Sequence, residues 1–182
     1  MKQLFLFSLL LLSAITNAQM NLVKNGAFER DMVNWRGEEI AALSPYEKKS
    51  GKNSVMINQF TGAEWRALDQ IVLIPKLTYA VECSVWIKTD QVESQKEEYK
   101  AAAVILEFTN DNEKQISTET IAQVKGTTSW TNYKKAVKIP SDAKKIRIML
   151  ALAQTNGTVF FDDVNLKALG EEEYAKVDSQ NK

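Results

Sequence analysis

The chain has 182 residues, in which 23 Lys and Arg balance 23 Asp and Glu, and it contains one cysteine and no histidine. A formal net charge of zero argues against a nucleic-acid partner and against binding to an anionic membrane surface. The lack of histidine excludes Ser-His-Asp and Cys-His nucleophiles and the common zinc sites, so an enzyme of this sequence would depend on carboxylates.

The first 18 residues have the pattern of a signal peptide. Lys2 gives the positive charge, an apolar run spans residues 4–12, and small residues precede a cleavage position after Ala18. The run is too short to cross a bilayer as a helix. We therefore expect a mature chain that starts at Gln19, has no membrane span and is secreted or periplasmic.

The mature chain alternates short strand patterns with polar turns, and about 160 residues suffice for one domain with a sizeable core. The expected strands are residues 22–28, 39–43, 54–59, 68–73, 78–89, 102–109, 115–124, 133–139, 145–152 and 159–166. Even spacing with Gly, Pro, Asn and Asp turns predicts an all-β fold, a sandwich or barrel, for the domain at residues 19–168. We expect a charged loop at 91–100 and a flexible acidic tail at 169–182, with at most one helical turn.

Two strands show which side chains point outward. From Tyr79 to Ile87 every second residue is apolar, so that face is core, and the lone Cys83 is a small buried residue rather than half of an internal disulfide. Glu82 and Trp86 lie on the opposite face of the same strand. In the strand at 145–152, Ile and Leu alternate in the same way with outward Arg, Met and Ala residues.

These outward residues predict a shallow sugar-binding groove, in which small residues make the hollow, an aromatic ring stacks on a sugar and polar groups bind hydroxyls. If the two strands share a sheet, Trp86 and Arg147 face one groove with Glu82. Trp65 lies at a loop-to-strand junction, where a ring is harder to bury. Gln70 can bond either a sugar hydroxyl or a neighbouring backbone. Trp86 has the alternative of packing under a loop.

Motifs along the chain carry a family resemblance: Asn21-Leu-Val-Lys-Asn-Gly-Ala-Phe-Glu29 followed by Trp35, Gly51-Lys-Asn-Ser-Val55, Tyr79 with Ser84-Val-Trp-Ile-Lys88, Trp130-Thr-Asn-Tyr133 and Phe161-Asp-Asp-Val-Asn-Leu166. In order and spacing, over about residues 21–168, they resemble the CenC-type carbohydrate-binding modules of families four, nine, sixteen and twenty-two. The resemblance implies a galactose-binding-like fold, a jelly-roll β-sandwich of two antiparallel sheets. It also implies a structural calcium ion and a non-catalytic role in binding an oligo- or polysaccharide beside glycoside hydrolases.

Carboxylates near both ends of the mature chain are candidate calcium ligands. Glu29 follows a turn at Asn25-Gly26, and Asp162 and Asp163 lie in the last expected strand. Calcium prefers oxygen ligands, so the three carboxylates can share one ion if the first and last strands pair. The alternative is that these side chains cap turns.

Three classes of function remain open. The first is a sugar-binding module without catalysis, and the second is a structural or adhesive sandwich in which Trp65 and Trp86 are both buried. The third is a carboxylate-based glycoside hydrolase with Glu82 and Glu107 facing each other across the groove.

Overall fold

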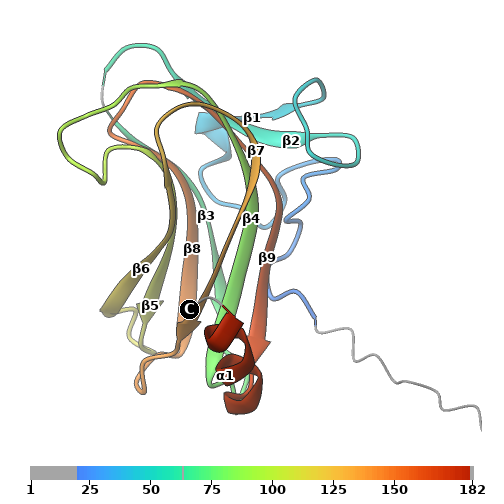
Figure 1. Ribbon diagram of the computed structural model, residues 1–182, viewed down its shortest axis with the longest axis vertical. Helices are drawn as coiled ribbons and strands as arrows, with labels where there is room; N and C mark the ends of the chain where they lie inside the picture. The colour runs from blue at the N-terminus through green and yellow to red at the C-terminus, as the bar shows by residue number, and fades with distance from the viewer. Residues whose placement is uncertain (1–19, 63, 181–182) are drawn as a thin grey trace, which may run out of the picture.

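The computed structural model describes residues 20–62 and 64–180, and these form a β-sandwich (Figure 1). One antiparallel sheet has five strands in the order β1-β2-β9-β4-β7, and the other has four in the order β3-β8-β5-β6. The predicted all-β sandwich of two antiparallel sheets is therefore confirmed. The expected signal peptide lies outside the described residues.

The bounds of the elements are as follows. The five-stranded sheet contains β1 (Ala41–Ser44), β2 (Ser54–Gln59), β9 (Gly157–Leu169), β4 (Ala80–Val92) and β7 (Gly126–Lys138). The four-stranded sheet contains β3 (Trp65–Leu73), β8 (Lys145–Ala153), β5 (Ala102–Thr109) and β6 (Gln115–Val124). A 3-10 helix, Glu38–Ile40, precedes β1, and the α-helix α1 (Glu171–Gln180) follows β9.

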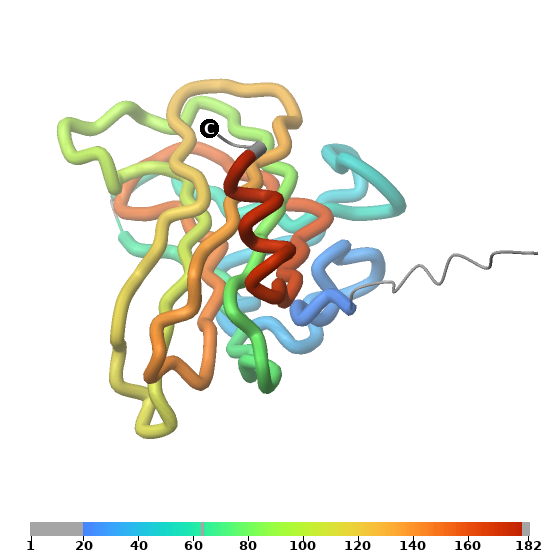
Figure 2. The backbone as a smooth tube through the Cα atoms, turned by 60° about the horizontal axis from the view of Figure 1, so that its bottom comes forward, coloured from blue at the N-terminus to red at the C-terminus, as the bar shows by residue number. Residues whose placement is uncertain are grey.

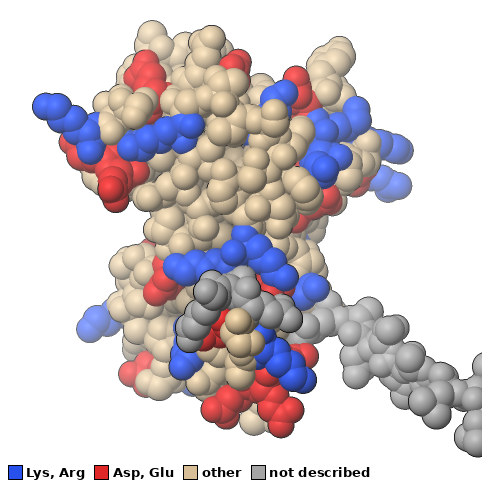
Figure 3. Space-filling view, in the orientation of Figure 1, with Lys and Arg blue, Asp and Glu red and all other residues tan. Residues whose placement is uncertain are grey.

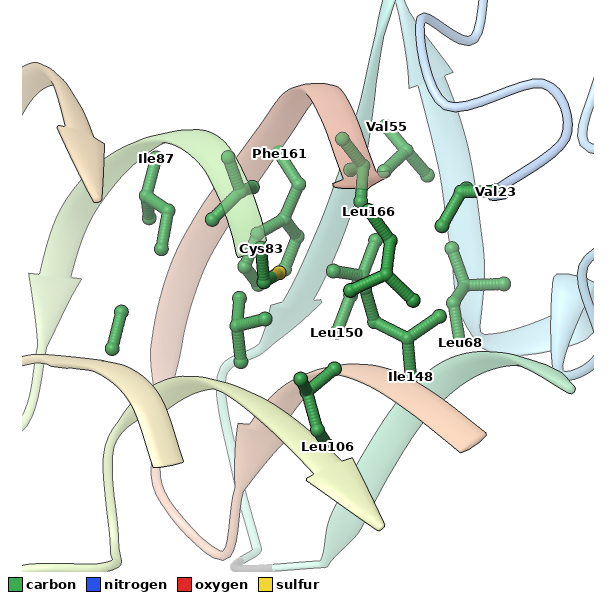
Figure 4. Packing of buried hydrophobic residues seen from close by; sticks show 14 of the residues in the cluster. Val23, Val55, Leu68, Cys83, Ile87, Leu106, Ile148, Leu150, Phe161 and Leu166 are labelled. Atoms are coloured by element: carbon green, nitrogen blue, oxygen red, sulfur yellow. The ribbon is translucent and has the colours of Figure 1, made fainter. Parts of the chain in front are cut away.

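The core lies between the sheets, where alternate apolar residues of both meet. In Figure 4 the sulfur of Cys83 points into this layer, near Phe161 of the same sheet and opposite Leu106 and Ile148. All four residues are fully buried. Burial, with a smaller contribution from the charge of Glu82, raises the pKa of the Cys83 thiol to about 12. The predicted burial of Cys83 is thus confirmed.

The chain that precedes the 3-10 helix is not the strand that the sequence pattern predicted for residues 22–28. It runs beside β9 (Figure 2), with Leu22 N donating to Leu166 O at 2.8 Å and Val164 N donating to Gly26 O at 2.9 Å. Positive φ angles at Asn25 (52°) and Phe28 (50°) break the extended conformation. The segment therefore folds as a series of bends against β9 rather than as a strand of the sheet.

The tail forms a longer helix than the single turn that was predicted. Helix α1 lies at the end of the sandwich where β9 ends (Figure 1). At its start the Glu173 side chain reaches back, and Glu173 Oε2 accepts a hydrogen bond from Gly170 N at 3.0 Å. Tyr174 packs edge-on against Tyr79 with 5.7 Å between ring centroids, and Lys138 Nζ lies about 5.5 Å from each ring. These aromatic and cation–π contacts fix the helix on the domain.

Charge is spread over the surface rather than concentrated. On the face seen in Figure 3, basic and acidic side chains are interspersed around a broad uncharged area. This distribution agrees with a formal net charge of zero. Within residues 20–62 and 64–180, no helix is long and apolar enough to cross a membrane.

Candidate functional site

The four-stranded sheet has one face turned away from the core, here named the outer face of the four-stranded sheet. It includes Trp65, Ala67, Asp69 and Ile71 of β3, Arg147, Met149 and Ala151 of β8, and Ala103, Ile105 and Glu107 of β5. These residues alternate with the buried core residues of the same strands. The register sets Arg147 between Ile71 and Glu107, so three neighbouring strands meet at this point.

A buried carboxylate holds two arginines on this face. Arg147 Nη2 donates to Asp69 Oδ1 at 2.7 Å, and Arg36 Nε donates to Asp69 Oδ2 at 2.7 Å. The Asp69 side chain is only 8 % exposed, while those of Arg36 and Arg147 are 58 % and 37 % exposed. The hydrogen bond that Arg147 donates to Asp69 is the main cause that raises the pKa of Arg147. Asp69 therefore fixes two partly exposed charged groups on this face.

The backbone explains how Arg36 reaches the site. Arg36 and Asp69 exchange both backbone hydrogen bonds, at 2.8 Å and 3.0 Å, and so form an isolated bridge at the edge of β3. Asp69 occupies an outward position in the run 68–73, so the alternation of that strand was a signal that sequence reasoning missed. Arg36 had no local signal, because only its pairing with β3 brings it to the sheet.

A hollow of about 240 Å³ opens at the arginine end of the face, here named the charged hollow. It is lined by Arg36, Ile71, Glu107, Thr109, Glu113, Lys145 and Arg147. Lys145 Nζ pairs with Glu113 Oε1 at 3.0 Å at its rim. The buried Nε of Arg147 has no hydrogen-bond partner, and Glu107 makes no ion pair within the part of the chain that the structure describes. The charged hollow thus combines unused donors with an acceptor.

Trp65 lies at the other end of the outer face. It is 45 % exposed and stands opposite Ala153 of β8. Six residue steps along β3 separate it from Ile71, or about 20 Å. The small residues between the two ends do not form the open hollow that was predicted, because Ala103 and Ala151 are 1 % and 0 % exposed. The accessible parts of this face are therefore the tryptophan and the charged hollow.

The expectation that Trp86 and Arg147 face one groove is wrong. Trp86 and Glu82 belong to β4 in the five-stranded sheet, whereas Arg147 belongs to β8 in the other sheet, and each points outward. Lys49 Nζ lies 4.0 Å from the centre of the half-buried Trp86 ring. Trp86 therefore packs under the loop before β2. Glu82 pairs with Lys134 at 2.9 Å, so its carboxylate already has a charged partner.

Two further possibilities for the groove do not hold. Gln70 points into the molecule, is 5 % exposed and bonds the backbone of Lys24 through both ends of its amide, at 2.8 Å and 2.9 Å. Of the two partners considered for Gln70, a sugar hydroxyl or a neighbouring backbone, the fold therefore provides the backbone. Glu82 and Glu107 lie on opposite sheets, so they do not face each other as the pair that a glycoside hydrolase requires.

The three predicted calcium ligands converge on the loop before β2. Asp162 is fully buried, and its Oδ2 accepts hydrogen bonds from Lys49 N at 2.8 Å and Ser50 N at 3.1 Å. Ser50 Oγ donates to Asp163, and Glu29 Oε2 accepts from Lys52 N at 2.8 Å. Burial, the larger cause, raises the pKa of Asp162, while these backbone bonds oppose the rise.

These contacts are of the turn-capping kind that was the alternative to metal binding. No group of three acidic, His or Cys side chains in residues 20–62 and 64–180 is arranged to hold a metal ion. An ion here would therefore need backbone or water oxygens beside the carboxylates. The fold does leave a tight cradle, because a Cβ atom on Gly51 would lie 1.7 Å from Glu29 Oε1.

The sequence matches the model of a carbohydrate binding domain family, CBM_4_9, over residues 20–157. The chain belongs to this family. The resemblance to carbohydrate-binding modules is thereby confirmed, and the match covers most of both sheets, including Trp65 and Arg147. A search of curated proteins by sequence gives no match.

Solved structures show the same fold in other carbohydrate-binding modules. Family 16 Carbohydrate Binding Module-2 has a TM-score of 0.58 and 16 % identity, with coverage of 80 % of this chain and 99 % of that one. TmCBM61 in complex with β-1,4-galactotriose has a TM-score of 0.56 and 16 % identity, with coverage of 83 % and 100 %. At such identity the likeness shows the fold alone.

A phage protein contains a region of the same fold within a larger chain. The enzymatically active domain of tailspike protein 4 of bacteriophage CBA120 has a TM-score of 0.62 and 14 % identity. The match covers 82 % of this chain but only 21 % of the tailspike chain. The chain thus spans about a fifth of the length of that protein.

Proposed function

We propose that this carbohydrate binding domain holds a glycan on the outer face of the four-stranded sheet. The observation that carries the proposal is the pair of arginines, Arg36 and Arg147, which Asp69 holds and which line the charged hollow beside Glu107. Family membership supports a role in sugar binding. The location of the glycan on this sheet face and its contacts with these side chains are what we propose.

The chemistry of the charged hollow suits hydroxyl groups. A sugar hydroxyl both donates and accepts hydrogen bonds, a guanidinium has five N–H donors, and an ionised carboxylate only accepts. Arg36 and Arg147 would accordingly donate to sugar oxygens, while Glu107 would accept from sugar hydroxyls. Because Asp69 already orders both arginines, little side-chain entropy is lost when the ligand binds.

Trp65 is the proposed stacking platform of the site. Its exposed ring offers a flat apolar surface to the C–H face of a sugar, as aromatic side chains at partly apolar sites do. The length of strand between Trp65 and Ile71 is long enough for a chain of several sugar rings rather than a single one. We therefore propose an oligo- or polysaccharide as the ligand, bound without catalysis.

A glycan screen followed by titration tests this function. The mature chain should retain one or a few neutral oligosaccharides on a glycan array. Titration calorimetry of the best of them should give a Kd in the micromolar to millimolar range, about −4 to −8 kcal/mol. An array on which no glycan is retained, together with no heat on titration of long plant and microbial polysaccharides, would favour a structural or adhesive role instead.

We also propose that a structural calcium ion binds where Glu29, Asp162 and Asp163 meet the loop before β2. The proposal is supported by the convergence of carboxylates from both ends of the domain and by the cradle at Gly51. A cation would offset the cost of ionising the buried Asp162. It would also link the segment that contains Glu29 to β9.

Removal of calcium tests this second proposal. An ion that binds only the folded state stabilises it by about 2.7 kcal/mol at a concentration of 100 times the Kd. A chelator should therefore lower the Tm of the unmutated chain, and Asp162→Asn should have little remaining response to the chelator. If the Tm of the unmutated chain is the same with calcium and with chelator, these carboxylates only cap the loop.

A further inference from the structure

A second hollow, here named the edge hollow, lies beside β3, which is an edge strand of the four-stranded sheet. It measures about 430 Å³ and is larger than the charged hollow. Its lining consists of residues 70–73 of β3 together with Leu22, Lys24 and Asn34 of the N-terminal segment. Ile71 lines both hollows, so the two hollows meet at this residue.

The backbone of β3 has an unpaired stretch that faces the edge hollow. Asp69 exchanges backbone hydrogen bonds with Arg36 on the side of β3 that is turned away from β8. The backbone groups of every second residue point to the same side of a strand, so those of Ile71 and Leu73 also point away from β8. Among residues 20–62 and 64–180, no partner bonds the N–H or C=O groups of these two residues. The edge of β3 thus presents two donors and two acceptors to the edge hollow.

The unpaired stretch is short. Arg36 closes the edge at Asp69, and the chain leaves the edge at Asn34, where φ is 76°. At the other end Ile74 N donates to Lys144 O at 3.0 Å, and Pro75 has no N–H group. A peptide that adds to a sheet edge pairs over the length of a strand, commonly about 5–6 residues. The edge hollow therefore suits a compact group that bears hydroxyls better than it suits a protein strand.

The other groups of the edge hollow also suit a sugar. Lys24 and Asn34 are exposed, and their side chains have no partner within the described part of the chain. The backbone of Lys24 is held because both of its polar groups bond the amide of Gln70. Ile71 and Leu73 are 40 % and 72 % exposed and offer apolar surface beside these polar groups. Apolar surface with a few fixed polar groups is typical of small-molecule sites.

We propose that the edge hollow receives a branch of the glycan whose main chain lies on the outer face of the four-stranded sheet. This inference rests on the proposed function and names the class of ligand, a polysaccharide with single-sugar branches. Hydroxyls of the branch would accept from the N–H groups of Ile71 and Leu73 and donate to their carbonyl oxygens. The branch would leave the main chain at Ile71, where the two hollows meet.

Calorimetry with matched pairs of oligosaccharides tests this proposal. Each pair has the same β-1,4-linked main chain, of glucose, xylose or mannose units, with and without one single-sugar branch. In the pair whose main chain binds, the branched member should bind at least about five-fold more tightly, because several hydrogen bonds to the edge of β3 are gained. In ¹⁵N NMR spectra, the branched member should shift the Leu73 amide signal, and the unbranched member should not.

Variants of the edge hollow should remove the preference and leave binding of the unbranched member unchanged. The double variant Lys24→Ala, Asn34→Ala removes the two polar side chains. Lys76→Ala is its matched control, because Lys76 is exposed and does not line the edge hollow. Leu73→Pro removes an N–H group that points away from β8, so no bond between strands is lost. Leu73→Ala keeps that N–H group and should retain a stronger preference for the branched member than Leu73→Pro.

The possible failures are distinguishable. Equal affinity for the two members of a pair, or an unchanged preference in the folded double variant, would overturn the branch and leave glycan binding on the outer face intact. Failure of every pair to bind would contradict the proposed function and the branch with it. A Leu73 amide signal that shifts with protein concentration in the absence of sugar would make the edge of β3 an interface between copies of this chain, and would also overturn the proposal.

Discussion

At the scale of single residues, Asp69 determines the character of the candidate site. Its side chain is almost buried, and an unpaired buried charge is costly, so the two arginines that bond it are held in place. Arg147 and Arg36 then present their free N–H groups to the charged hollow. The five-stranded sheet also has an ion pair on its outer face, between Glu82 and Lys134. Neither of these two residues lines the charged hollow.

The different positions of Arg147 and Lys134 predict different effects of their replacement on glycan binding. Arg147→Met should weaken binding of a glycan ligand about ten-fold or more, because hydrogen bonds to charged groups contribute about 1.5–3 kcal/mol. Asp69 keeps Arg36 as its partner in this variant, so the fold should persist. Lys134→Met, which removes a cation from the five-stranded sheet, is the matched control and should bind like the unmutated chain. Equal losses in both variants, measured by calorimetry, would contradict a site on the four-stranded sheet.

At the scale of elements, the segment before β1 depends on close contact with β9. Gly26 O accepts from Val164 N, and a Cβ atom on Gly26 would lie 2.1 Å from Val164 O. No side chain fits there without moving one of the two backbones. The Gly26 position is therefore set by packing against β9 as well as by the bend that the sequence suggested.

A pair of glycine variants tests this contact. Gly26→Ala should lower the free energy of unfolding by about 1–3 kcal/mol, the usual cost of overpacking. Gly170→Ala is the matched control, because its nearest heavy atom would be the flexible Glu173 carboxylate at 3.9 Å. Urea denaturation of both variants gives the comparison. A Gly26→Ala protein as stable as the Gly170→Ala protein would mean that the segment does not pack on β9 as described.

The elements that could be predicted from the sequence are those whose pattern is local. The predicted strands 54–59, 102–109 and 115–124 have the same bounds as β2, β5 and β6, because alternation and turn residues define them. The predicted strand at 22–28 failed because Asn25 and Phe28 have positive φ angles. Asn adopts such angles readily, whereas at Phe28, which is buried against Trp35, packing rather than local preference accounts for the angle.

At the scale of the whole molecule, the site could be predicted only in part. Alternation correctly put Arg147 and Trp86 on outward faces, but sheet membership depends on pairing between distant strands. The chain crosses between the two sheets several times, and in doing so it separates β4 from β8 (Figure 1). The outward residues that looked like one groove are therefore divided between opposite faces of the sandwich, and only Trp65 and Arg147 remain together.

The most direct test of the account compares glycan binding by Trp65→Ala and Trp86→Ala. Trp65 is 45 % exposed on the outer face of the four-stranded sheet, whereas Trp86 packs under Lys49 on the other sheet. Calorimetry with the glycan found by array should show Trp65→Ala losing about ten-fold or more in affinity with its Tm nearly unchanged. Trp86→Ala should keep its affinity and lose stability. The reverse result, with affinity lost in a folded Trp86→Ala protein and kept in Trp65→Ala, would contradict the proposed site.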